Sequence, residues 1–354
     1  NPLMKIDAVI GNPPYQLTVA KKETDNGQKA VINIFQLFQE LVDQLPPHYS
    51  SLIYPGGRWI HRSGKGLADF GLKQINDAHL SKLIFYANAG SLFDDAAIAD
   101  GLSIVLKDYQ KTKAGFSYIY GANQEIQLAP PGDKLIPLNP QHMRINGCLE
   151  RIVRNHHFCF LSEHILPRSL FSIESDFVER NPALVREYNE GEVLGDNEIK
   201  LFTNDKAGKS GRARWYVANK DVIKTGVEQI GRWKVVVSSA NAGGQKRSNQ
   251  LAIMDNRSAF GRSRVALKTF VTEREAKNFF AYCQTDFIRY TFLLTDEALT
   301  SLAKLVPDIG DYTDENGVID FTNDINAQLY RLFEIDTDMQ SIIAQTLKEK
   351  EAGR

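Results

Sequence analysis

The sequence predicts an α/β fold for residues 1–110, followed by a mixed α+β region over residues 111–354. Apolar runs and segments of helical periodicity alternate along the first part in the order strand, helix, strand, helix. This order requires crossover connections and favours a largely parallel sheet. A Pro-rich connector at 128–140, followed by short strand-like runs between turns, indicates a different architecture for the second part.

The elements of the first part follow from local patterns. Residues 6–11 (IDAVIG) form a short apolar run that ends in glycine, as a buried parallel strand does. Residues 31–44 place apolar side chains at helical spacing, and the Pro-Pro pair at 46–47 ends this helix. We expect further elements, in chain order, at 51–54 (strand), 67–78 (helix), 82–86 (strand) and 102–107 (strand).

The second part mixes short strands with longer helices. The runs WYVA, WKVVVSS and RVALKTFV predict strands. Helical spacing at 274–294 and 325–335 predicts helices. We find no internal repeat and no low-complexity tract.

The composition argues against several classes of protein. Hydrophobic residues make up 43% of the chain, enough for a substantial core. No apolar run approaches the roughly 18 residues of a membrane span, and no signal peptide is visible. The three cysteines, Cys148, Cys159 and Cys283, have no paired spacing, which argues against a disulfide framework or a zinc site. These features predict a cytoplasmic protein without a membrane partner.

Two stretches contain residue types that can bind metal ions, but we predict no metal site in either. His156 and His157 precede Cys159, but no second ligand cluster lies at a structural-zinc spacing, so local packing is favoured. The acidic stretch at 93–101 lacks the Asp…Glu-x-Lys arrangement of a nuclease. The sequence thus predicts no metal site, and magnesium is expected only if a nuclease domain exists elsewhere.

Residues 11–15 (GNPPY) combine stiffness with hydrogen-bond acceptors. Asn12 and Pro13 each precede a proline, which confines them to extended conformations. The loop therefore offers the Asn12 side-chain carbonyl and the Pro13 carbonyl as fixed acceptors at the carboxyl end of a strand, where ligands bind in open parallel sheets. Tyr15 adds a ring on which a base could stack, worth roughly 1–3 kcal/mol. A tight strand-to-helix turn is the alternative interpretation.

Two rigid acceptors suit a group with two N–H donors, such as an exocyclic amine or a carboxamide. The lone pair of an adenine amino group is delocalised into its ring, so the nitrogen is a poor nucleophile. Accepting both hydrogens favours a more pyramidal nitrogen whose lone pair points at an electrophile, which is preorganised electrostatic stabilisation.

NPPY after an apolar strand resembles the catalytic motif of the adenine-specific (N6) DNA methyltransferases of type II and IIG restriction–modification systems, which use S-adenosylmethionine. The resemblance extends to 234–270 and 304–335, which are similar to the target-recognition and carboxyl-terminal regions of that family. It implies a partial Rossmann-like methyltransferase sheet, later strands only, over 1–110, and a DNA target-recognition and carboxyl-terminal helical region over 111–354.

The resemblance also assigns roles to single residues. The target adenine would be flipped out of duplex DNA, its amine held by Asn12 and Pro13 and its ring stacked on Tyr15, with Pro14 completing the catalytic motif. Asp7 corresponds to the acidic residue before the motif, near the strand start, and it is a weak cofactor-binding candidate together with Gly11. Candidate walls of the base pocket are Phe93 and Trp59, although a packing role suits Trp59 equally.

The Gly-rich cofactor loop of this family should lie upstream of NPPY, yet only eleven residues precede Asn12. We expect that the chain is the carboxyl-terminal part of a larger protein, or that a partner chain supplies the cofactor half. The isolated chain would then hold an incomplete S-adenosylmethionine site and be inactive.

Basic residues are concentrated in the middle of the chain. Residues 200–277 carry 17 Lys and Arg against 6 Asp and Glu, a net charge of +11, whereas residues 278–354 have a net charge of −8. Such a block is typical of a polyanion-binding surface, and a solvated basic face is the alternative. The expected contacts to double-stranded DNA are Lys209, Arg212, Arg214, Lys246, Arg247, Arg257, Arg262 and Arg264.

Three alternatives remain open. The chain could be the DNA-recognition portion of a bifunctional restriction endonuclease–methyltransferase. It could methylate RNA or a protein glutamine, because a carboxamide also offers two N–H donors. It could also be a recognition module that is not an enzyme by itself.

Overall fold

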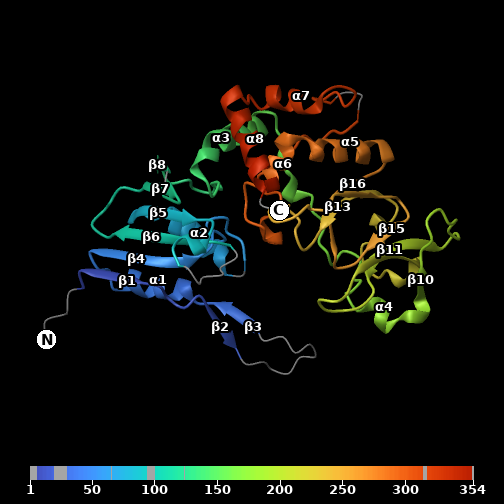
Figure 1. Cartoon of the computed structure of the whole chain (residues 1–354), viewed down its shortest axis with the longest axis horizontal. Coiled ribbons are helices and arrows are strands. Elements are labelled where there is room, and N and C mark those ends of the chain that lie inside the picture. Colours follow the sequence, from blue (N-terminus) through green and yellow to red (C-terminus); the bar gives the residue numbers. More distant parts are fainter. Residues whose placement is uncertain are drawn as a thin grey trace. The chain divides into compact units, whose positions relative to one another are not determined.

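The structure, a computed structural model, describes residues 6–19, 30–64, 66–93, 100–122, 124–313 and 317–352. It consists of two compact units (Figure 1). Unit 1 comprises Asn1–Asn146 and Leu294–Ser301, and unit 2 comprises Gly147–Leu293 and Leu302–Arg354. This division falls later in the chain than the boundary expected near residue 110, because two more strands extend the first sheet.

Unit 1 is built on a six-stranded sheet of order β1–β4–β6–β5–β7–β8 (Figure 1). Pairs β1–β4 and β5–β7 are parallel, whereas β6 is antiparallel to both of its neighbours and β8 is antiparallel to β7. In chain order the strands are β1 (Ala8–Gly11), β4 (Tyr49–Pro55), β5 (Leu80–Tyr86), β6 (Leu102–Asp108), β7 (Phe116–Tyr120) and β8 (Gln124–Leu128).

The α/β class is confirmed, but the sheet is mixed rather than largely parallel. Parallel neighbours need a crossover, usually a helix, whereas a chain that turns back directly pairs antiparallel. Among its described residues, the connection from β5 to β6 contains only a short 3₁₀ turn, Ala89–Ser91. Strand β6 therefore lies between β4 and β5 and runs in the opposite direction to both.

Residues 31–44, expected to form one helix, instead contain the end of a strand followed by a helix. Strand β3 (Ala30–Asn33) pairs antiparallel with β2 (Gln16–Val19), and helix α1 (Phe35–Gln44) begins two residues later. Adjacent Val and Ile favour a strand over a helix. The resulting hairpin directly follows the NPPY loop and projects from the sheet (Figure 1). Helix α2 (Leu67–Ile75) lies where a helix was expected.

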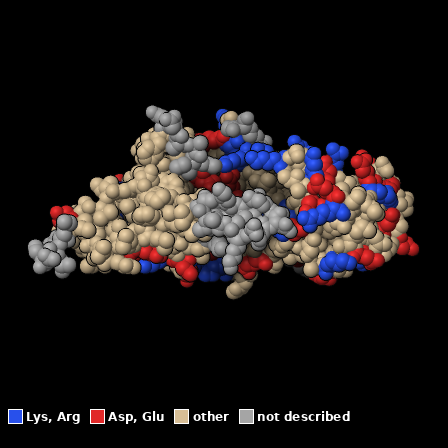
Figure 2. Space-filling view, turned by 90° about the horizontal axis from the view of Figure 1, so that it is seen from below, with Lys and Arg blue, Asp and Glu red and all other residues tan. Residues whose placement is uncertain are grey.

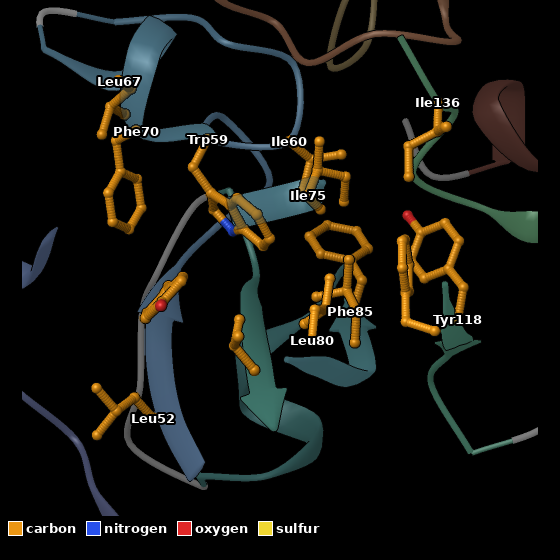
Figure 3. Close-up of a cluster of buried hydrophobic side chains, with 14 of the residues drawn as sticks. Leu52, Trp59, Ile60, Leu67, Phe70, Ile75, Leu80, Phe85, Tyr118 and Ile136 are labelled. Atoms are coloured by element: carbon orange, nitrogen blue, oxygen red, sulfur yellow. The ribbon is translucent and has the colours of Figure 1, made fainter. Parts of the chain in front are cut away.

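An aromatic cluster forms the core of unit 1. The rings of Phe35 and Phe70 lie 5.5 Å apart and those of Tyr54 and Trp59 5.4 Å apart, both edge to face. Figure 3 shows Trp59 in the middle of the cluster, with Phe70 on one side and Phe85 on the other. This packing fixes the segment after β4 to the sheet.

A buried ammonium ties the helices of unit 1 to the sheet. Lys107 of β6 is fully buried. Its Nζ donates to both carboxylate oxygens of Asp43 on α1, at 3.0 and 3.1 Å, and to Asp77 Oδ2, at 2.6 Å, after α2. Buried charges are tolerated only when they are paired in this way.

Unit 2 is a mixed α+β unit, as expected for this region. Its sheets have the orders β10–β12–β11–β15, β14–β13–β16 and β17–β9. The strands are β9 (Cys159–Phe160), β10 (Val185–Glu187), β11 (Glu198–Asn204), β12 (Ala213–Asn219), β13 (Trp233–Ser238), β14 (Ala252–Met254), β15 (Ser258–Phe260), β16 (Arg264–Phe270) and β17 (Pro307–Asp308).

The helices after the first sheet are α3 (Met143–Asn155), α4 (Phe177–Arg180), α5 (Glu273–Gln284), α6 (Asp286–Phe292), α7 (Ile325–Leu332) and α8 (Thr337–Ala352). The helix expected at 274–294 is divided at Thr285, whose side chain accepts from Ile288 N and caps α6. Across the described ranges, no helix combines the length and apolar composition required to cross a membrane.

Candidate functional site: the NPPY loop at one end of the sheet

Three loops of unit 1 meet at one end of its sheet. Gly11 at the end of β1 lies opposite Leu52 of β4, and the last residues of β4 and β5 both lie opposite Leu102, the first residue of β6. The NPPY loop, the turn after β4 and the segment after β5 therefore share this end. The topology thus places the expected catalytic motif where α/β sheets bind ligands.

The NPPY loop presents some of its residues to solvent and anchors others. Pro13 is buried, whereas Asn12 and Pro14 are exposed. Tyr15 is half-buried against the aromatic core, and its carbonyl accepts from Ile34 N at 3.0 Å. The loop is thus held at both of its ends while the Asn12 side chain stays accessible.

Tyr15 and Asn12 also contact each other through their side chains. Burial raises the pKa of the Tyr15 phenol, and a side-chain hydrogen bond with Asn12 acts in the opposite direction. Since the net shift is upward from 10, the phenol is neutral at pH 7. The hydrogen bond restrains the Asn12 amide next to the ring.

A hydrogen bond and an ion pair hold the turn after β4 against the segment before β6. Gly56 N donates to Gly101 O at 2.9 Å, and Arg58 pairs with Asp100 at 2.7 Å. A Cβ on Gly101 would lie 2.1 Å from the Tyr86 carbonyl oxygen, so only glycine fits there. No motif signals Arg58 and Asp100 in the sequence, because 42 positions separate them and the fold alone pairs them.

The two residues expected to wall a base pocket lie in different environments. Phe93 follows β5 at the same sheet end, is 41% exposed and donates its N–H to Ala89 O at 3.0 Å. Trp59 is fully buried, and its Nε1 donates to Ser103 Oγ at 2.8 Å. Ser103 Oγ in turn donates to Gly56 O, so Trp59 supports the turn from inside the core.

The two weak cofactor candidates flank β1. Gly11 ends the strand, and a Cβ there would make an ordinary 3.6 Å contact with Leu52. Asp7 precedes the strand, with its carbonyl accepting from Tyr49 N at 3.0 Å and its side chain exposed. A strand of four residues spans about 13 Å, so Asp7 and Asn12 lie at opposite ends of β1.

The eight basic residues expected to contact DNA all lie in unit 2. In Figure 2, the Lys and Arg atoms of the visible face lie mainly over this unit, interspersed with Asp and Glu. Five of the eight side chains are exposed: Lys209, Arg212, Arg214, Lys246 and Arg247.

The other three basic residues are partly buried by their contacts within unit 2, whereas Arg212 and Arg214 stay exposed although Arg212 donates to backbone carbonyls and Arg214 pairs with Asp205. Arg257 donates to two backbone carbonyls near the start of β11. Arg262 forms two hydrogen bonds with Glu174, at 2.9 and 2.7 Å. Arg264 lies 4.6 Å from the centre of the Phe202 ring, and burial lowers its pKa. These contacts leave the five exposed residues as the more accessible group.

A cluster of Cys159, His164 and Asp308 in unit 2 has side-chain ligand atoms within 4.8 Å of one another. Asp308 is fully buried and accepts from Lys268 at 2.5 Å, from a tyrosine hydroxyl and from a backbone N–H. A cation would compete with Lys268 for the carboxylate. The cluster instead connects β9, β16 and β17 through hydrogen bonds.

Comparison with known proteins identifies the first part of the chain as similar to restriction–modification adenine methyltransferases, which confirms the resemblance based on NPPY. The family model that matches is "Eco57I restriction-modification methylase", over residues 2–93. An "uncharacterized adenine-specific methylase" of Mycoplasma pneumoniae (strain ATCC 29342 / M129 / Subtype 1) is 43% identical over 58 residues. These residues are 16% of this chain and 13% of that relative, so the chain matches a small part of it.

Three solved structures show weaker similarity. A chain from a study of a type I R-M system has 14% identity and a TM-score of 0.25, covering 43% of this chain and 31% of that one. The ATP-dependent Type ISP restriction-modification enzyme LlaBIII bound to DNA has 12% identity and a TM-score of 0.32, covering 74% and 24%. The type IIG restriction endonuclease BpuSI has 12% identity and a TM-score of 0.31, covering 98% and 53%. TM-scores this low do not establish a shared fold.

Proposed function

We propose that the chain is the base-binding and DNA-recognition portion of a site-specific DNA adenine N6-methyltransferase of a restriction–modification system. The observation that carries the proposal is the position of the NPPY loop, which holds Asn12 exposed beside the half-buried Tyr15 ring at the carboxyl end of β1. The match of residues 2–93 to a restriction–modification methylase family supports it.

The loop would bind the amino group of a flipped adenine. The Asn12 side-chain oxygen and the Pro13 carbonyl accept its two hydrogens, and the base stacks on Tyr15. If the Asn12 amide N–H donates to Tyr15, its oxygen is directed to the amine. Because the Tyr15 phenol is neutral at pH 7, it adds no charge beside the reacting nitrogen.

The methyl donor would be S-adenosylmethionine, which supplies an electrophilic methyl group when bound. The described residues at this sheet end suit the binding of the target amine, but they do not form a complete cofactor site. Asp100, a carboxylate at this end, is engaged by Arg58. Among the described residues, the strand-to-loop position after β1 is occupied by NPPY rather than by a Gly-rich loop.

The open edge of β1 supports a second segment as the source of the cofactor half. Strand β1 ends the strand order, and among the described residues it pairs only with β4. Ile10 on this strand is 82% exposed, and Leu37 and Leu41 of α1 are each 54% exposed. An unpaired edge flanked by apolar side chains is a surface for further strands. The segment that binds there belongs to the same polypeptide or to a partner chain.

The test is methyl transfer to duplex DNA by the protein together with its cofactor-binding segment. Asn12→Ala is expected to abolish transfer, because one of the two acceptors is lost. Asn155→Ala, on the exposed end of α3, is the matched control and should retain activity. Full activity of Asn12→Ala, or transfer to RNA or a glutamine-containing peptide but not to DNA, would contradict the proposal.

A further inference from the structure

Unit 2 contains a pocket of 540 Å³, and Arg247, one of the expected DNA contacts, belongs to its lining. It lies between the loop 243–251, the end of α5, helix α6 and helix α8. Its size is in the range of small-ligand sites and exceeds what one phosphate group fills.

Three cationic side chains from three different elements line this pocket. Arg247 comes from the loop, Arg289 from α6 and Lys350 from α8. The described lining otherwise consists of glycine, apolar and uncharged polar residues, without a carboxylate. Arg289 also pairs with Glu351 at 2.8 Å and with Asp286 at 3.3 Å, which holds its guanidinium in place but offsets its charge, so the inference depends mainly on Arg247. A concave surface lined by one sign of charge concentrates ions of the opposite sign.

The loop that carries Arg247 is fixed before any ligand binds. The buried Asn241 side chain donates to Arg247 O and accepts from Lys246 N at 3.4 Å. Asn249 O accepts from Ser238 N of β13 at 2.7 Å. Gly244 has a φ of +75°, a conformation that favours glycine. Preorganisation of this kind lowers the entropic cost of binding.

We infer that this pocket binds a phosphate group, and that the phosphodiester backbone of DNA is its ligand. The inference rests on the proposed function for the choice of DNA, since a free phosphorylated ligand has the same chemistry. A single arginine guanidinium can donate two parallel hydrogen bonds to a phosphate group. Because the Arg247 side chain is exposed, we expect it to be the main contact. Such a contact positions the duplex without reading its sequence.

The first test measures DNA binding of the chain by fluorescence anisotropy across a series of salt concentrations. Arg247→Gln is expected to weaken binding about tenfold for two duplexes of unrelated sequence. The slope of log K against log salt should become shallower by about 0.9, the value for one phosphate contact. Lys277→Gln, which removes a surface charge paired with Glu273 on α5 outside the pocket, is the control and should leave both quantities close to wild type. Equal affinities and slopes for Arg247→Gln and the control would overturn the inference.

The second test separates the two phosphate sources by calorimetry with inorganic pyrophosphate. A phosphate site predicts binding by the wild type and by Lys277→Gln that is lost in Arg247→Gln. If the wild type binds pyrophosphate but not DNA, the site takes a free phosphorylated ligand and the proposed DNA function fails. If the wild type binds DNA but Arg247→Gln changes neither DNA nor pyrophosphate binding, the proposed function survives and this pocket is excluded.

Discussion

Tyr15 belongs both to the core of unit 1 and to its candidate site. Its ring packs against the aromatic cluster, while its hydroxyl forms a hydrogen bond with the Asn12 side chain. The ring position is therefore set by packing that does not depend on a ligand. The same residue restrains the amide that we expect to accept a hydrogen bond from the target base.

This arrangement separates two effects of substituting Tyr15. Tyr15→Phe keeps the stacking surface but removes the hydrogen bond to Asn12, so we expect a rate of methyl transfer lowered about fivefold, corresponding to about 1 kcal/mol, with DNA affinity unchanged. Tyr15→Ala should lower affinity as well, because the stacking surface is lost. Single-turnover rates and binding titrations distinguish the two. An unchanged rate for Tyr15→Phe would show that the hydroxyl contact does not position Asn12.

At the scale of elements, local patterns predicted four strands of unit 1, but they predicted neither the pairing of these strands nor β2, β3, β7 and β8. The expected strands correspond to β1, β4, β5 and β6, because short apolar runs need no distant information to be recognised. The antiparallel direction of β6 depends on how its connection returns, which local patterns do not encode. The hairpin of β2 and β3 was missed because α1 follows β3 almost at once.

The candidate site likewise has one part that the sequence predicts and another part that only the fold reveals. NPPY is contiguous, and its chemistry follows from neighbouring residues. Arg58 with Asp100 and Arg247 with Arg289 are brought together only by the fold, across 42 positions in each case. Such pairs cannot be found from sequence spacing without a structure or co-varying relatives.

The buried Lys107 joins three elements, so its loss should affect unit 1 as a whole. Lys107→Met leaves the Asp43 and Asp77 carboxylates without their shared partner. We expect the free energy of unfolding to fall by about 3–5 kcal/mol. Urea denaturation followed by circular dichroism measures this change. Lys73→Met, on the exposed face of α2, should stay within about 0.5 kcal/mol of the wild type. A similarly small effect for Lys107→Met would show that the ion-pair network contributes little.

At the scale of the whole molecule, the chain passes through residues Gly147–Leu293 of unit 2 and then returns to unit 1. Segment Leu294–Ser301 belongs to unit 1. Asp296 anchors it: His61 Nδ1 lies 3.2 Å from its carboxylate, and Ser63 and Ser301 donate to that carboxylate at 2.7 and 2.8 Å. Unit 1 is therefore incomplete without a segment that begins 148 positions after the end of its first segment.

Asp296 makes the stability of unit 1 dependent on pH. Burial raises its pKa, but His61 and Ser63 outweigh this effect and lower it to about 2. A depressed carboxyl pKa stabilises the fold above the unfolded value of about 3.9, and this contribution is lost as the pH falls towards 2. We expect Asp296→Asn to lower the free energy of unfolding by about 2 kcal/mol at pH 7, with the difference disappearing between pH 4 and pH 2.

Urea titrations at several pH values measure this difference. The exposed Asp133→Asn is the control and should show no comparable pH-dependent difference from the wild type. If the difference in the free energy of unfolding between Asp296→Asn and the wild type stayed constant across pH 2–7, the effect would come from the shape of the side chain rather than from its charge.

The edge of β1 that pairs with no described strand also affects newly made protein. Residues Ala8–Gly11 contain neither a charge nor a proline, the features that usually discourage edge-to-edge aggregation. Until that edge is covered, copies of the chain can add to one another through it, and chaperones and proteases compete for the exposed strand. The supply of the segment that covers β1 would then set how much of this protein a cell retains.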